Sequence, residues 1–531
     1  MATDRSIERG EMGAIAQGTR SSATPRARGS LRQRLGWLGT TLLLAPLLVA
    51  LGGTFFFAPT DPDYWWHART GQLISETGRL PKTDIYSFAS ADRPWVTHEW
   101  LTELLLYQIE HQAGYVANVA LFAVLGVLTA LLIYLHARRR GLDRFGATIA
   151  MLWGFAILLP LANVRPQMVT VCAIAFCVLL LVAYRQGARR ALWALPPLFA
   201  IWVNLHGGYV IGLALLALTL GGEALERALI PGQTRRAWLR ALAPLTAATA
   251  LAVLATLLNP HGLEALRYPL SYVGTGNVSQ RYVAEWQSPN FHDGAFLPFA
   301  VALLLGIVVG IGRRPLGWPE RLWVGVFALL GLQSIRHLPL FAVIATPILM
   351  GELAALSREW PGQAWWRPRW RIARQVGLSA LALGALVLVM TIGTGPAMRA
   401  QLQLGTAPNA TGYPAGALAY LRAHEGDPAL HGRLFNEYRW AGYLIYYLYP
   451  ERQVFVSAQA TDPYGSDLFT PYRRTIQLAP GWRDTLDSWR IDLVLIDKDG
   501  PLAVMLQTDA GWHEVYAGEV ERLFVRQGER R

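Results

Sequence analysis

The chain has 531 residues, of which 53% are hydrophobic and only 16% are charged. A soluble core does not need so large an apolar surplus, so the composition excludes a simple soluble protein and indicates a membrane protein with several spans. The net charge of +12 comes from arginines in short gaps between apolar runs, and this pattern does not favour nucleic acid as a partner. Cys172 and Cys177 share one apolar run and are expected to be small core residues rather than a disulfide or a metal site.

The first 57 residues divide into a polar tail and an apolar span. Residues 1–34 are rich in arginine and have no apolar period, which predicts a disordered basic cytoplasmic tail. Residues 35–57 carry no charge and are long enough to cross the roughly 30 Å hydrocarbon layer. A cleaved signal peptide has a shorter apolar region, so we expect an uncleaved anchor with its N-terminus inside.

Ten more apolar runs follow, which makes eleven predicted transmembrane helices. They lie at 116–135, 146–162, 168–184, 191–203, 208–222, 241–258, 296–311, 322–334, 338–354 and 376–394. Every second gap collects arginines, as short cytoplasmic loops do. An odd number of spans places everything after residue 394 outside the cell. The runs at 191–203 and 322–334 are the shortest, and loss of just one of them would invert the C-terminal side.

Residues 395–531 are predicted to form an extracytoplasmic soluble α/β domain. Residues 414–424 resemble a short helix with proline at its start. The β-branched runs at 452–457 and 491–496 predict strands, and residues 514–516 with 522–526 predict a closing hairpin.

The remaining gaps face outward and carry acids, histidines and single arginines. The candidate site residues in them are Asp61, Asp63, His67, Asp84, His98, Glu99, Arg165, His206, His261, Arg281, Glu285, Arg336 and His337. The first six lie in one outer loop, residues 58–115, and most of the others lie in loops only a few residues long. Ionisable groups so close to the bilayer are costly unless they are paired or face a wet cavity. We therefore expect these side chains to share one substrate-binding cavity.

Each of these groups also has a purely structural interpretation. Asp61 or Asp63 could cap a helix that starts near residue 64, which explains one acid more easily than both. Single histidines at helix ends are often caps, and tryptophans near the bilayer often form an interfacial belt. Arg165 and Arg336 are lone cations in outward loops, where the positive-inside bias disfavours them, so a functional role is the alternative to a stray surface charge.

These residues resemble the GT-C glycosyltransferases, multi-span membrane enzymes that use polyprenyl-phosphate-linked sugar donors. In that class an acid or an acidic pair stands in the first outer loop, which also carries short helices lying along the membrane. Asp61 and Asp63 match the acids, and the segments 65–66 and 98–101 match the helices. The resemblance implies a GT-C-like transmembrane domain over residues 35–394. The Asp-x-Asp-x-Trp-Trp-His opening is also similar to a group of uncharacterised bacterial membrane proteins.

The C-terminal domain carries a second likeness. Residues 436–443, followed by the hydrophobic run 454–456, are similar in layout to the start of the outer domain in oligosaccharyltransferase catalytic subunits. A Trp-Asp-Tyr-Gly segment reads the acceptor there. Residues 440–443 are Trp-Ala-Gly-Tyr and lack that aspartate, so the likeness does not imply recognition of a peptide sequon.

The predicted function follows from sidedness and from the resemblance. Nucleotide sugars are made inside the cell, so an outward-facing transferase of the inner membrane needs a sugar carried on polyprenyl phosphate or diphosphate. Arg336, Arg165 or Arg281 is expected to hold that phosphate, because a guanidinium meets phosphate oxygens in pairs. Asp61 or Asp63 is expected to orient and deprotonate a glycan, lipid or protein acceptor. A single displacement then inverts the anomeric centre.

Several alternatives stay open at this point. A divalent cation such as Mg or Mn is one, with Asp61, Asp63 and Glu285 as oxygen ligands. A glycan polymerase or ligase of the O-antigen type relies mainly on a large late outer loop, whereas the acidic loop comes first here. A transporter or flippase places ionisable residues near the midplane, whereas these spans are mostly free of charge. A non-catalytic scaffold that binds cell-wall polymer also fits.

Overall fold

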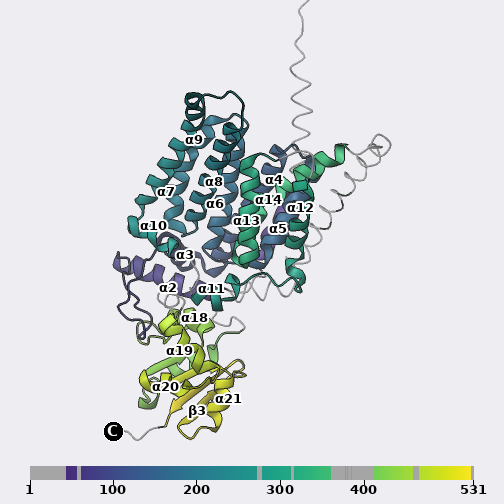
Figure 1. The fold of residues 1–531 in the computed structure, drawn as a ribbon. Helices are drawn as coiled ribbons and strands as arrows, with labels where there is room; N and C mark the ends of the chain where they lie inside the picture. Colours follow the sequence, from purple (N-terminus) through teal and green to yellow (C-terminus); the bar gives the residue numbers. More distant parts are fainter. Residues whose placement is uncertain are drawn as a thin grey trace, which may run out of the picture.

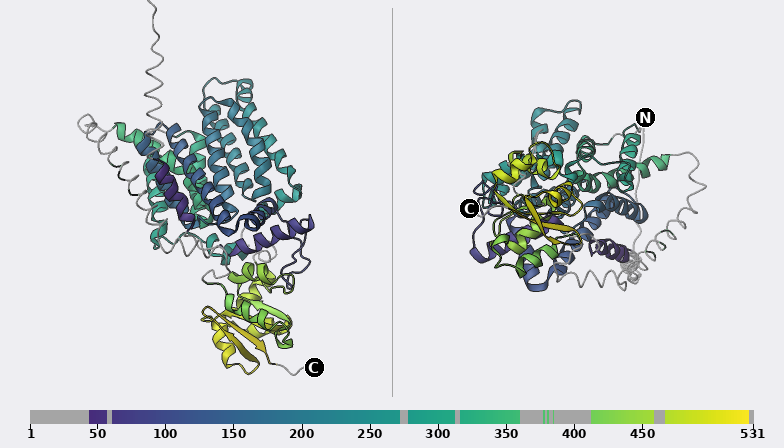
Figure 2. Two further views of the ribbon diagram at one scale, coloured as in Figure 1. Left: turned by 180° about the vertical axis from the view of Figure 1, so that it is seen from behind. Right: turned by 90° about the horizontal axis from the view of Figure 1, so that it is seen from below.

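The computed structural model describes residues 44–56, 61–271, 278–311, 316–359, 377, 380, 384, 412–457 and 466–527. A bundle of long helices forms one end of the molecule and an α/β domain forms the other (Figure 1). Two helices, α2 (Pro62–Thr77) and α3 (Trp100–Ala113), lie across the end of the bundle between these parts (Figures 1 and 2). The predicted disordered tail at 1–34 and the predicted boundary at residue 395 lie outside the described residues.

Among the described residues, the bundle consists of the helix Leu44–Phe56 and nine further helices. These are α4 (Tyr115–Arg139), α5 (Arg144–Leu158), α6 (Gln167–Arg185), α7 (Leu195–Leu205), α8 (Tyr209–Ala228), α9 (Arg235–Ala255), α12 (Leu297–Ile311), α13 (Trp318–Gln333) and α14 (Leu338–Glu359). The short helices α10 (Leu263–Leu270) and α11 (Val278–Tyr282) belong to the connections on the side of the α/β domain. Ten of the eleven predicted ranges therefore fall on helices, while 376–394 lies almost wholly outside the described residues.

Among the described helices, fewer than the predicted eleven are both long enough and apolar enough to cross a membrane. Within the described part of the chain, six segments are long and apolar enough to span a membrane, so eleven spans are not confirmed. The run at 191–203 shows why: a 3-10 turn over Arg189–Ala194 precedes α7, which has only 11 residues. At 1.5 Å per residue α7 reaches roughly 16 Å, about half of the hydrocarbon layer.

Helix α14 lies at the centre of its half of the bundle, against α4, α5, α6, α12 and α13. Small residues let these helices approach closely, as is usual where helices pack without water. A Cβ added at Gly154 of α5 would lie 2.8 Å from the Thr346 hydroxyl of α14. Ala342 and Ala345 of α14 are fully buried in the same interface.

The arginine-rich loops meet at the end of the bundle away from α2 and α3, which we call the basic end. There Arg140 donates to Glu320 at 2.8 Å and to Glu352 at 2.7 Å. Arg185 forms ion pairs with Glu223 and Glu226. These acids come from α8, α13 and α14, so the charges predicted to face the cytoplasm tie the helix ends together.

The α/β domain contains a four-stranded sheet with the order β1-β2-β4-β3. Its strands are β1 (Arg433–Asn436), β2 (Ile491–Asp497), β3 (Trp512–Ala517) and β4 (Glu521–Arg526), with β1 parallel to β2 and the other pairs antiparallel. Its helices are α17 (Ala415–Ala423), α18 (Ala441–Leu448), α19 (Ser466–Ile476), α20 (Trp482–Ser488) and α21 (Pro501–Thr508). The predicted helix at 414–424, the strand at 491–496 and the hairpin are confirmed.

The predicted strand at 452–457 is wrong. Val454 makes only single bridges, one to Ser87 of the first outer loop and one to Leu434 of β1. The segment lies between two partners that each meet it at one residue, so no continuous ladder forms. Its apolar side chains are buried nonetheless, which accounts for the strand-like pattern.

The α/β domain is docked on α2 through aromatic side chains. Trp65 of α2 has ring contacts with Tyr443, Tyr446 and Tyr447 of α18, at centroid distances of 5.3 to 5.8 Å. Gly442 lies so close to α2 that an added Cβ would be 2.2 Å from the Pro62 carbonyl oxygen. The helix that begins at the predicted acids is therefore held from outside by the C-terminal domain.

Candidate active site

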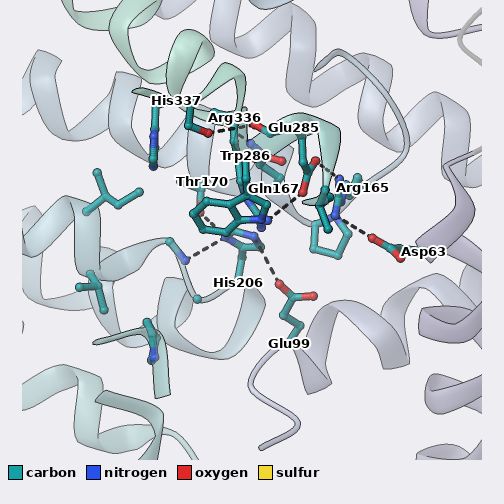
Figure 3. Close-up of a pocket in the computed structure, with 18 of the residues that line it drawn as sticks. Asp63, Glu99, Arg165, Gln167, Thr170, His206, Glu285, Trp286, Arg336 and His337 are labelled. Atoms are coloured by element: carbon teal, nitrogen blue, oxygen red, sulfur yellow. Dashed lines mark hydrogen bonds and ion pairs between the residues drawn. The ribbon is translucent and has the colours of Figure 1, made fainter. Parts of the chain in front are cut away.

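A cavity of about 820 Å³ lies where the bundle, the crosswise helices and the α/β domain meet, within the usual size of ligand pockets. It is lined by nine of the thirteen predicted site residues: Asp63, His67, His98, Glu99, Arg165, His206, Glu285, Arg336 and His337. These come from five separate loops and helix ends, so the expected convergence on one cavity is observed for most of the set (Figure 3).

What we call the acid–guanidinium cluster consists of Asp61, Asp63, Arg165, Glu285 and Arg336, all of which except Asp61 line the cavity. The Arg165 guanidinium lies 2.7 Å from Asp63 Oδ2, 2.5 Å from Glu285 Oε2 and 3.8 Å from Asp61 Oδ2. Arg336 reaches the other oxygen of Glu285 at 2.9 Å. Figure 3 shows Glu285 between the two arginines, with Asp63 on the far side of Arg165. Two permanent cations thus compensate acids that sit in a poorly hydrated wall.

The two predicted acids have different positions. Asp61 is the N-cap of α2: its Oδ1 accepts the backbone N–H of Asp63 at 2.9 Å, and its Oδ2 accepts from Asn163 at 2.7 Å. Burial raises the pKa of Asp61 to about 6, although Arg165 opposes the shift. Asp63 lies one step into the helix, lines the cavity and accepts from Trp66 Nε1 at 3.1 Å. The capping interpretation therefore describes Asp61, while Asp63 faces the cavity.

What we call the imidazole cluster consists of His67, His98, Glu99, Glu103 and His206, all of which except Glu103 line the cavity. Glu99 Oε1 lies 3.3 Å from both His98 Nε2 and His206 Nε2, and Glu99 Oε2 lies 3.5 Å from His67 Nε2. The other nitrogen of His67 meets Glu103 at 3.2 Å. Burial pushes the pKa of Glu99 upward, but the three imidazoles outweigh burial and hold that pKa below its ordinary range. Glu99 is therefore an ionised carboxylate facing the cavity.

His206 is held in one tautomer. The Gly208 backbone N–H donates to its Nδ1 at 2.9 Å. Trp202 donates to the Thr170 hydroxyl, which leaves that hydroxyl to donate to the same Nδ1 at 2.6 Å. With Nδ1 occupied as an acceptor, the proton of the neutral ring is on Nε2, directed at Glu99. Burial lowers the pKa of His206 to about 3, with Arg336 and Arg165 acting in the same direction.

Near Arg336 the cavity offers several donors. The Arg336 guanidinium stacks over the Trp286 ring at 4.9 Å from its centroid, and Gln167 donates to the Arg336 carbonyl at 3.0 Å. His337 Nδ1 is buried without a hydrogen-bond partner among the described residues. This corner combines the Arg336 guanidinium with the Trp286 ring, and His337 also lines it.

Four predicted residues do not line the cavity. Asp61 is turned into the helix cap described above. Asp84 binds the N–H groups of its own turn and the Ser90 hydroxyl, so it organises the loop rather than a substrate. His261 lies outside the cavity lining, and its Nε2 is buried without a hydrogen-bond partner among the described residues. Arg281 is exposed on α11, with its guanidinium 5.4 Å from the Tyr282 ring centroid.

The structure also adds residues that the candidate set lacks. Glu103 anchors His67, and Asn163 fixes the Asp61 carboxylate. Gln167, Trp286 and Tyr438 line the cavity, the last from the α/β domain. Asn163 and Gln167 flank Arg165 in an outward loop, and this proximity was an available signal. Glu103 looks like an ordinary polar position of an amphipathic helix, so nothing in the sequence marks it.

This fold, with a helical bundle, an acid-bearing first loop whose helices cross the bundle end and an α/β domain over the cavity, is similar to that of solved GT-C glycosyltransferases. The archaeal oligosaccharyltransferase AglB from Archaeoglobus fulgidus, in complex with an inhibitory peptide and a dolichol-phosphate, matches with a TM-score of 0.53 and 12% identity over 86% of this chain and 69% of that one. ArnT from Cupriavidus metallidurans, in the apo state, matches with a TM-score of 0.50 and 14% identity over 93% of this chain and 98% of that one. No protein-family model and no curated protein sequence matches this chain.

Proposed function

We propose that this protein is a multi-pass glycosyltransferase of the cytoplasmic membrane, with its N-terminus inside and its α/β domain outside. It transfers a sugar from a polyprenyl phosphate or diphosphate to an acceptor, with inversion. The observation that carries this proposal is a single cavity that joins the Asp63 carboxylate to the Arg165 and Arg336 guanidiniums. The AglB structure with a dolichol-phosphate supports a lipid-phosphate ligand for this fold.

The phosphate is bound at the Arg336 corner. Arg336 has five N–H donors, and its described ion pair with Glu285 engages one of its terminal nitrogens. His337 lines the same cavity, as do the apolar residues Val210, Ile211 and Leu340. A lipid-linked phosphate therefore finds a cation beside apolar surface that suits its chain, which supports approach from the bilayer between helices.

Asp63 is the base and Asp61 its support. The acceptor oxygen forms its bond to the anomeric carbon while the bond from that carbon to the phosphate oxygen breaks. The phosphate leaves with the electron pair, and the acceptor proton passes to Asp63. A positioned base contributes about 10²- to 10⁴-fold. Asp61 holds the first turn of α2 and thereby the position of Asp63.

Glu99 completes the site by binding sugar hydroxyls. Its carboxylate faces the cavity and is kept ionised by the surrounding imidazoles. Sugar hydroxyls donate well to such an acceptor, since hydrogen bonds to ionised groups are about twice as strong as neutral ones. The imidazole cluster thus binds the donor sugar. The acid–guanidinium cluster acts where the bond between the anomeric carbon and the phosphate oxygen breaks and the bond to the acceptor forms.

The position of the charges favours this proposal over transport. The ionisable groups of the cavity belong to loops and helix ends on one side of the bundle, whereas a transporter needs them near the midplane. An O-antigen-type polymerase or ligase remains the alternative enzyme, but the acid facing the cavity comes from the first outer loop.

The test uses the full-length protein in liposomes with a panel of synthetic undecaprenyl-phosphate- and undecaprenyl-diphosphate-linked sugars, and a cell-envelope extract as acceptor source. We expect one donor to release lipid phosphate while its labelled sugar appears in the acceptor fraction, and Asp63→Asn to abolish both. The proposal fails if no donor is consumed, or if Asp63→Asn turns over as fast as the wild type.

A further inference from the structure

The three acids that the sequence offers as possible metal ligands each receive hydrogen bonds from protein donors at both carboxylate oxygens. Asp61 accepts from the Asp63 backbone and from Asn163, one donor at each oxygen. Asp63 accepts from Trp66 and Arg165 in the same way. Glu285 accepts from Arg165 at 2.5 Å and from Arg336 at 2.9 Å. All six carboxylate oxygens therefore already receive a hydrogen bond.

The centre of this arrangement is the Arg165 guanidinium. It is the one group within 4 Å of all three acids among the described ion pairs, and its side chain is mostly buried. Burial lowers the pKa of Arg165, but the three acids outweigh burial and raise that pKa well above its ordinary value. Arg165 therefore carries a permanent charge at the point where three carboxylates converge.

We infer that Arg165 is the built-in cation of this site, occupying the place that a divalent metal would take between Asp61, Asp63 and Glu285. A metal ligated by these oxygens at about 2.0 to 2.6 Å would need the space between the three acids that the guanidinium fills. The residues present therefore do not fit a metal unless Arg165 leaves. In the described residues no group of three acid, histidine or cysteine side chains is arranged to hold one.

The built-in cation also reaches the ligand. Two of the five N–H donors of Arg165 appear in its described hydrogen bonds to Glu285 and Asp63, and the side chain lines the cavity. The remaining donors can meet the phosphate beside Arg336, so two guanidiniums replace the charge that a metal would supply. The role of Arg165 toward the phosphate rests on the proposed function, but the inferred cation can be tested without measuring sugar transfer.

The experiment measures Mn²⁺ binding to the purified full-length protein by electron paramagnetic resonance. We expect no bound equivalent for the wild type, because Arg165 already compensates the acids. Arg165→Ala is expected to gain one bound Mn²⁺ equivalent. Arg165→Lys, which keeps the charge, is expected to behave like the wild type. Arg281→Ala, an exposed arginine outside the cluster, is the matched control and is expected to bind none.

The location is checked by adding Asp63→Asn to Arg165→Ala, which should remove the gained equivalent. A wild-type protein that binds one Mn²⁺, with loss of that ion in Asp63→Asn, would overturn the inference directly. A folded Arg165→Ala protein, judged by circular dichroism, that binds no Mn²⁺ would also overturn it. A catalytically silent protein with the expected Mn²⁺ pattern would instead contradict only the proposed function.

Discussion

The two ends of the bundle use the same residue types for different purposes. At the basic end, Arg140 is paired with Glu320 and Glu352, and these partners join the ends of neighbouring helices. At the cavity end, Arg336 is paired with Glu285 but also lines a space of about 820 Å³. Charge pairing alone therefore does not identify a functional residue. An ion pair that lines an open cavity does indicate a functional residue, because only there can a ligand bind the charged group.

The largest effect is expected at Asp63. Asp63→Asn should lower transfer by about 10²- to 10⁴-fold, since the amide cannot take the acceptor proton. Asp61→Asn should have a much smaller effect, because asparagine is also a good N-cap. The rate of lipid-phosphate release measures both. Equal losses in the two variants would contradict the division of roles between cap and base.

The second-largest effect is expected at Arg336, and it is compared with a variant at the basic end of the bundle. Arg336→Ala should weaken donor binding by roughly 10- to 100-fold, the worth of a hydrogen bond to a charged group. Inhibition by undecaprenyl phosphate measures this affinity. Arg140→Ala is the matched control from the basic end and should leave the affinity unchanged while lowering thermal stability. If Arg140→Ala weakened donor binding as strongly as Arg336→Ala, the cavity assignment would be wrong.

The third-largest effect is expected when the contact between the α/β domain and α2 is disrupted. Gly442→Val should destabilise the protein by about 1–3 kcal/mol, because the new side chain meets the Pro62 carbonyl and Trp66. The displaced α2 should also lower turnover per folded molecule. Gly426→Val, at a loop position where an added Cβ meets nothing within 4 Å, is the control. Unchanged unfolding temperature and turnover in Gly442→Val would show that the domain does not position α2.

The smallest effect is a pH dependence of stability from the imidazole cluster. Burial lowers the pKa of His67, but Glu103 and Glu99 outweigh burial and raise that pKa above its ordinary 6.5. Its stabilisation is present below pH 6.5 and is lost as pH rises through the raised value. The pKa of Glu99 is depressed, so its stabilisation is present above its ordinary 4.5 and is lost in acid.

The thermal unfolding temperature from about pH 3 to about pH 9 measures this effect, because the Glu99 contribution is lost only below its ordinary pKa of 4.5. We expect a maximum between the two ordinary values and a fall toward alkaline pH. Glu99→Gln should flatten the profile on both sides, because it removes the carboxylate that couples the imidazoles. An unchanged profile in Glu99→Gln would show that the cluster does not couple these protonation equilibria.

Most helices were predictable because hydrophobicity and arginine placement are local properties of the chain. Ten apolar runs are helices, and the arginine-rich gaps lie together at one end. The number of spans was less predictable, since α7 is apolar but short and preceded by a 3-10 turn. The strand predicted at 452–457 was wrong because a β-branched run shows burial, not the presence of a pairing partner.

The sequence by itself determined which side chains reach the cavity end, because short loops cannot carry their polar groups away from the helices. It could not separate Asp61 from Asp63, since both are acids in one turn and only the cap geometry with Asn163 distinguishes them. It could not show that Arg165 fills the space between three acids from two other loops, or that Glu103 anchors His67. These pairings join residues 36 to 120 positions apart, and only tertiary packing brings such groups within hydrogen-bond distance.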